Sequence, residues 1–99
     1  MTIEVLYFEG CPNLEPTLEL ARSVAEELGV DAAVRKVEVL DHEEAQRLRF
    51  LGSPSVRVGG VDIEPGADAR TEYALSCRVY EISGVPPKEL LVAALKSRT

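Results

Sequence analysis

The chain has 99 residues, of which 45% are hydrophobic and 28% charged, and its formal net charge is −6. This length and balance predict one globular domain over residues 1–99. The negative charge argues against binding to nucleic acid or to an anionic membrane surface, because both depend on clustered lysine and arginine.

The start of the chain has no basic segment followed by a long apolar run and a small-residue cleavage site. The two cysteines, Cys11 and Cys77, are too few and too far apart for the disulfide framework of a small secreted protein. We therefore expect a cytoplasmic protein with no membrane association.

Residues 3–8 are almost all apolar, which is typical of a central strand covered on both faces. After them the apolar residues change to the spacing of an amphipathic helix, with Asn13 as its cap and Gly29 as its C-terminal stop. The apolar stripe of this helix comprises Leu14, Leu18, Ala21, Ala25 and Leu28.

Cys11 lies between this strand and this helix, and Pro12 follows it directly. A thiolate at a helix N-terminus is stabilised by unpaired backbone N–H groups and by the positive end of the helix dipole. The position therefore predicts a reactive thiol. The alternative is that Cys11 is a small apolar residue packed in a turn.

Alternating apolar and charged residues predict a second strand over 34–40, parallel to the first in a βαβ unit. Asp41 with Glu44 three residues later resembles a capping box, and predicts a short helix that ends at Gly52.

The pair Gly59-Gly60 supplies the positive φ angles of a two-residue turn, and predicts a hairpin formed by 55–58 and 61–64. In this hairpin Val58 should face Val61 on the core side, as Val56 should face Ile63. Arg57 should face Asp62 on the other side as a pair of opposite charges.

Residues 65–86 show no clear periodicity and are predicted to form an irregular inserted segment that carries Cys77. So long a connection is commonly functional, and its apolar and aromatic content favours docking onto the body of the domain. A last helix should begin at Pro87 and bury Leu91 with Ala94 or Leu95.

The element order β-α-β-α-β-β-α, with Cys11 at the first strand-to-helix turn and Pro54 just before the third strand, resembles the thioredoxin-like fold in its minimal, glutaredoxin-sized form. Three segments look like those of a group of short bacterial thioredoxin-like proteins, sometimes described as alkylmercury-lyase-like: YFEGCPN (7–13), GSPS (52–55) and SCRVY (76–80). The resemblance implies an α/β fold with a mixed four-stranded sheet and helices on both faces.

The resemblance also implies roles for individual residues. Cys11 matches the attacking cysteine, Pro54 matches a cis-proline whose loop packs against it, and Ser53 would offer backbone groups to an extended thiol substrate. The position of the resolving cysteine is occupied by Leu14, which excludes exchange through a C-x-x-C motif. A mixed disulfide would then be resolved by a small thiol such as glutathione, by a second protein or by Cys77.

Other residues near these motifs leave alternatives open. Cys77 either acts with Cys11 or is incidental, and Arg78 either stabilises a thiolate or holds an anionic group, or is a surface-paired residue. Tyr7 and Tyr80 either supply hydroxyl donors near the site or pack in the core. The candidate catalytic residues are thus Cys11 and Cys77, and the candidate substrate-binding residues are Pro12, Ser53, Pro54 and Arg78.

A metal site built from Cys11, Cys77 and His42 is a competing constellation. Zinc sites use cysteines in close sequence pairs, which this chain lacks, and two thiolates alone suit a soft ion such as mercury or copper(I). We therefore predict no resident metal and no cofactor.

Two functional hypotheses follow from these residues. The first is a thiol-redox protein whose partners are protein or small-molecule thiols and disulfides, with Cys11 as the nucleophile. The second is a non-catalytic thioredoxin-fold binding module for a partner protein, a thiol ligand or a soft metal. Neither hypothesis fixes an oligomeric state.

Overall fold

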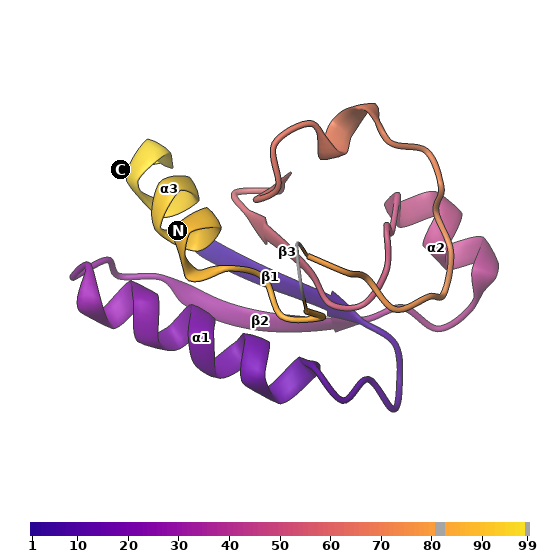
Figure 1. The fold of residues 1–99 in the computed structure, drawn as a ribbon, viewed down its shortest axis with the longest axis horizontal. Coiled ribbons are helices and arrows are strands. Elements are labelled where there is room, and N and C mark those ends of the chain that lie inside the picture. Colours follow the sequence, from indigo (N-terminus) through magenta and orange to yellow (C-terminus); the bar gives the residue numbers. More distant parts are fainter. Residues whose placement is uncertain (81–82, 99) are drawn as a thin grey trace.

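The computed structural model of the chain describes residues 1–80 and 83–98 (Figure 1). Its sheet has four strands in the order β2-β1-β3-β4: β1 (Thr2–Tyr7), β2 (Ala33–Glu38), β3 (Ser55–Val58) and β4 (Val61–Asp62). Strand β1 pairs in parallel with β2 and antiparallel with β3, and β3 pairs antiparallel with β4. The predicted mixed sheet and the central place of the first strand are therefore confirmed.

Helices cover both faces of this sheet: α1 (Leu14–Glu27), α2 (His42–Leu48) and α3 (Lys88–Arg98). Successive side chains of a strand point to opposite faces, so Ile3 and Val5 of β1 pack with α1 and α3, whereas Leu6 packs with α2. The larger core thus lies between the sheet and α1 with α3. A smaller one lies under α2.

The predicted limits of α1 agree with the structure, but its cap does not. Gly29 takes a left-handed φ of 67° and ends the helix as predicted. Asn13 occupies the N-cap position, yet its side chain makes no capping hydrogen bond. The Asn13 side chain lies instead against Gly84, where an added Cβ would collide with it.

The second strand and helix are shorter than predicted. Strand β2 ends at Glu38, although the Val39 N–H still donates to the Tyr7 carbonyl at 2.7 Å. Asp41 caps α2 as predicted, by accepting from the Glu44 N–H at 2.8 Å. Helix α2 ends at Leu48 and not at Gly52, because Arg49 takes a left-handed φ of 56° that stops the helix.

The hairpin has the predicted register, with Val58 opposite Val61 and Arg57 opposite Asp62. Three details are wrong. Strand β4 ends at Asp62 and not at Glu64. Val61 is 49% exposed and so lies outside the core. Arg57 does not pair with Asp62, because its Nη2 donates to the carbonyls at the end of α2, which have no partner within the helix: Leu48 O at 2.6 Å and Arg49 O at 3.2 Å.

The segment after the hairpin forms a wide arch in Figure 1, from β4 past α2 and back toward α3. It contains a short 3-10 helix, η1 (Ala67–Ala69). Helix α3 begins at Lys88, directly after Pro87, and buries both Leu91 and Leu95 completely. Within the described residues, no helix combines the length and apolar character needed to cross a membrane.

Candidate functional site

The candidate site lies at one end of the sheet, where β1 ends and β3 begins. The antiparallel register places Leu6 opposite Ser55, so the loop after β1 and the loop before β3 lie at the same end. The first loop carries Cys11 and the second carries Ser53 and Pro54. The topology therefore brings these two predicted loops to the same end of the sheet.

Cys11 lies in a tight turn that leads into α1. The Cys11 N–H donates to the Phe8 carbonyl at 3.3 Å, and the Leu14 N–H donates to the Cys11 carbonyl at 3.4 Å. The residue is partly exposed and its thiol is free. Pro12 beside it is exposed. The first turn of α1 follows this turn directly in the chain, and no side chain caps it.

The second loop is buried. Ser53 is fully buried, Pro54 is also buried, and the peptide bond between them is cis. The Ser53 hydroxyl has no hydrogen-bond partner within the described part of the chain.

Residues 73–80, which we call the strap, run beside this loop. The Ala74 N–H donates to the Phe50 carbonyl at 3.1 Å, the Ser53 N–H to the Ser76 carbonyl at 2.7 Å, and the Arg78 N–H to the Ser53 carbonyl at 2.9 Å. Ser53 and Cys77 thus form a parallel β-bridge. The expectation that Ser53 offers its backbone to a substrate needs correction, because the strap already occupies both groups.

Gly52 permits this close approach. Its φ is 123°, and a Cβ at this position would lie 3.1 Å from both the Ser76 carbonyl oxygen and the Arg78 Cβ. Contacts this short force the neighbouring atoms to move, and an L-residue resists this backbone conformation. Gly52 is therefore needed for the strap to dock, and it does not end α2.

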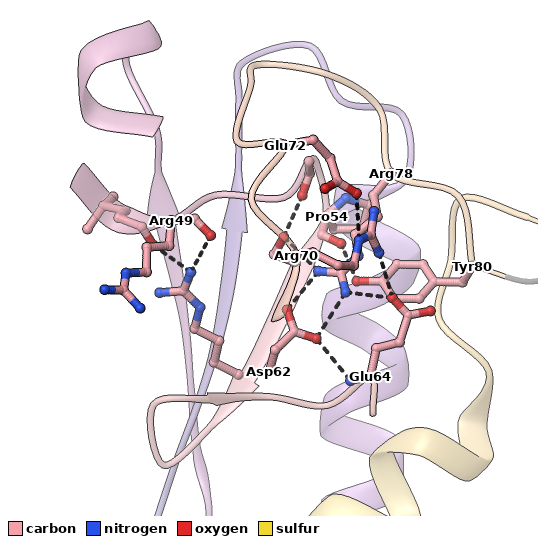
Figure 2. A network of polar contacts seen from close by, with 12 residues as sticks. Arg49, Pro54, Asp62, Glu64, Arg70, Glu72, Arg78 and Tyr80 are labelled. Atoms are coloured by element: carbon pink, nitrogen blue, oxygen red, sulfur yellow. Dashed lines mark hydrogen bonds and ion pairs between the residues drawn. The ribbon is translucent and has the colours of Figure 1, made fainter. Parts of the chain in front are cut away.

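Arg78 anchors the strap to the hairpin through a buried polar network (Figure 2). Its Nη1 donates to Asp62 Oδ2 at 2.7 Å and its Nη2 to Asp62 Oδ1 at 3.0 Å, which is a bidentate pair. Nη2 also donates to Glu64 Oε1 at 2.8 Å, and Nη1 to Ser55 Oγ at 3.0 Å. Within the described residues, Nε is the buried nitrogen of this side chain that lacks a partner.

These contacts correct the roles expected of Arg78. Its side chain is 1% exposed, and burial alone would disfavour its charge. The hydrogen bonds to Asp62 and Glu64 outweigh burial, so the pKa of Arg78 is raised and the guanidinium stays charged. With both carboxylates bound, Arg78 stabilises the strap and is not placed to stabilise a thiolate or to hold a substrate anion.

Tyr80 forms the far end of the strap. Its hydroxyl donates to the Pro54 carbonyl at 2.6 Å, and its ring centroid lies 4.7 Å from the Arg78 guanidinium carbon. The side chain is 1% exposed, and this burial raises the pKa of Tyr80. The core-packing interpretation therefore holds for Tyr80, whereas Tyr7 is half-buried at the end of β1.

Cys77 is exposed. Burial alternates over the last four residues of the strap, with Arg78 and Tyr80 buried and Cys77 and Val79 exposed. Both cysteines are free thiols. His42 is exposed at the start of α2. Among the residues that the structure describes, no group of three histidine, cysteine or acidic side chains could hold a metal ion, so Cys11, Cys77 and His42 do not converge.

No sequence pattern points to the acidic residues that hold Arg78. The hairpin register pairs Asp62 with Arg57, and nothing in the sequence gives Glu64 a role. Arg70 extends the same network, with Nη1 to Glu64 Oε1 at 3.2 Å and Nε to Glu72 Oε1 at 2.7 Å. No local pattern signals a contact between Arg78 and Asp62, which lie 16 positions apart.

Comparison of the chain with models of protein families, with curated proteins and with solved structures found no match. The assignment of a function therefore depends on the geometry and chemistry of this site.

Proposed function

We propose that the protein has a minimal thioredoxin-like fold and acts as a thiol-redox protein with Cys11 as its nucleophile. The observation that carries the proposal is the place of Cys11, a partly exposed free thiol between the central strand β1 and the uncapped start of α1. The mixed sheet order and the position of the Pro54 loop at the same sheet end support the fold. Two free thiols suit a reducing compartment such as the cytoplasm.

The reaction is thiol–disulfide exchange. The Cys11 thiolate attacks one sulfur of a substrate disulfide, forms a mixed disulfide and releases the other sulfur as a thiolate, which takes up a proton. If Cys77 resolves the mixed disulfide, its thiolate attacks the Cys11 sulfur, forms a Cys11–Cys77 disulfide and releases the remaining half of the substrate as a thiol. Two molecules of an external thiol then reduce that disulfide and are themselves joined as a disulfide. If an external thiol acts instead, it attacks the substrate sulfur of the mixed disulfide, forms a new disulfide with the substrate half and releases Cys11 as a thiolate.

The strap bears on the choice of substrate. An extended peptide would pair with the backbone of Ser53, but both groups of Ser53 are bonded to the strap. A small-molecule disulfide needs no such pairing. The occupied backbone therefore favours a small-molecule disulfide over an extended peptide, unless the strap is displaced.

The test uses glutathione disulfide as the substrate, followed by peptide mapping of the wild type and of the Cys11→Ser and Cys77→Ser variants. We expect a glutathione adduct on Cys11 in Cys77→Ser, and no adduct in Cys11→Ser on the same timescale. If Cys77 resolves, the wild type yields a Cys11–Cys77 bridge in place of the adduct. Modification of Cys77 ahead of Cys11 would contradict the proposal.

The second hypothesis, a non-catalytic binding module, makes a different prediction for the same samples. Cys11 would remain unmodified, and Cys11→Ser would bind a partner protein as the wild type does. Leu14 stands where a C-x-x-C motif has its resolving cysteine, and this substitution is the feature that supports the second hypothesis.

A further inference from the structure

A cavity of about 470 Å³ lies between the C-terminal end of α2, the β3–β4 hairpin and the turn that follows β4. Neither cysteine lines it, so it is separate from the candidate thiol site. Its volume is within the range of small-molecule sites. Much of the lining is apolar, from Leu48, Leu51, Val61, Pro65, Ala67 and Tyr73.

Two arginines line the same cavity, Arg49 and Arg57. Arg49 is exposed, and its guanidinium makes no hydrogen bond or ion pair with the described residues. Arg57 is fixed in place because its Nη2 donates to the Leu48 and Arg49 carbonyls, while its Nε and Nη1 make no such bond with the described part of the chain. The cavity therefore has cationic donors without protein acceptors.

The backbone of Arg49 supports a role for its side chain. Its φ of 56° is left-handed, and within the described residues Arg49 is the position other than glycine with a positive φ. Glycine fits such a helix end better than arginine does, so the backbone conformation does not explain why position 49 holds an arginine. Departures of this kind gather at functional sites.

The acidic residues of the lining are mostly already bound. Asp62 and Glu64 both accept hydrogen bonds from the buried Arg78, which neutralises part of their charge. Figure 2 shows the Arg49 side chain apart from these two carboxylates. Asp68 remains as an exposed acid on the turn side of the cavity.

We propose that this cavity binds a small organic acid, with its carboxylate held by Arg49 and Arg57 and its apolar or aromatic body against the lining. Guanidinium groups bind carboxylates through paired hydrogen bonds, and the fixed Arg57 loses little freedom on binding. The site is independent of thiol chemistry at Cys11.

The test is titration calorimetry with the naphthoate ion, against naphthamide as the neutral analogue of the same shape. We expect saturable binding of naphthoate that is weakened about tenfold to a hundredfold in Arg49→Gly, the loss expected for a charge-assisted hydrogen bond. Glycine suits the left-handed φ, so this variant keeps its fold. Arg47→Ala is the matched control, since Arg47 is exposed on α2 and outside the lining.

Amide NMR spectra locate the ligand. Shifts should centre on Leu51, Val61 and Gly66, and should be absent around Cys11. Absence of saturable naphthoate binding, equal binding of naphthamide, unchanged affinity in Arg49→Gly, or shifts centred elsewhere would each overturn the proposal.

Discussion

Arg78 connects three parts of the chain that are distant in sequence: the strap, strand β4 with the residues after it, and the start of β3. Its guanidinium donates to Asp62, Glu64 and Ser55, and its backbone N–H bonds to Ser53. Removal of one member of a buried charge network leaves the others without compensation, which costs more than the intact pair contributes.

Arg78→Ala should therefore lower the free energy of unfolding by about 3–5 kcal/mol, because it leaves Asp62 with an uncompensated charge and Glu64 with the Arg70 ion pair alone. Urea unfolding followed by circular dichroism measures this. Arg70→Ala is the control, since Arg70 is partly exposed and its ion pairs are screened by solvent, so its effect should be much smaller. The loss of unfolding free energy in Arg78→Lys should lie between those of Arg78→Ala and Arg70→Ala. Equal effects of Arg78→Ala and Arg70→Ala would contradict the assigned role of Arg78.

Tyr80 should make stability sensitive to alkaline pH. Burial raises the pKa of Tyr80, so the unfolded chain loses this proton first, near the ordinary tyrosine value of about 10. The contribution of Tyr80 is present below that pH and is lost as pH rises above it. Urea unfolding at increasing alkaline pH should show a shallower decline in Tyr80→Phe than in wild type. Parallel declines would contradict the assignment.

Single residues were the least predictable level from the sequence. Cys11 is a candidate because it stands next to a clear element boundary, whereas Pro54 is a candidate through the family resemblance, and both roles stay predictions. Ser53 and Arg78 were given substrate roles that the strap contradicts, since contacts between 53 and 76–78 or between 62 and 78 depend on how a non-periodic segment folds back.

At the scale of elements, periodicity identified β1, α1, the hairpin and α3, because each carries a regular apolar pattern or a turn with a specific φ requirement. The ends of α2 show the limit. Asp41 begins the helix through its own side chain, which the sequence reveals, whereas the helix ends early because Arg49 adopts a left-handed conformation that glycine usually takes. Arg57 then donates to the exposed carbonyls.

The docking of the strap should depend on Gly52. Gly52→Ala adds a Cβ against Ser76 and Arg78 at a positive φ, and should cost about 1–3 kcal/mol. Amide hydrogen exchange should show lost protection at Ser53 and Arg78. The Ser53 N–H donates to the strap, and the Arg78 N–H donates from the strap to Ser53. Gly59→Ala is the control, because Gly59 also has a positive φ but an added Cβ there meets no atom within 4 Å. Unchanged protection in Gly52→Ala would exclude this role.

At the scale of the whole molecule, the antiparallel pairing of β1 with β3 brings the Cys11 turn and the Pro54 loop to one end of the sheet. The resemblance to the thioredoxin-like fold predicts that the Pro54 loop packs against Cys11, whereas the local patterns predict only the individual strands and turns. Neither predicts that the strap would cover Ser53, and that contact shifts the expected substrate from an extended peptide to a small disulfide.

The central claim is that Cys11 is the nucleophilic thiol, and alkylation of single-cysteine variants tests it most directly. Iodoacetamide should react at neutral pH faster with Cys11 in Cys77→Ser than with Cys77 in Cys11→Ser, although Cys11 is the less exposed thiol. In urea the two rates should converge, because unfolding removes any difference in reactivity that the fold creates between the two thiols. A folded Cys11 that reacts no faster than Cys77 would contradict the account.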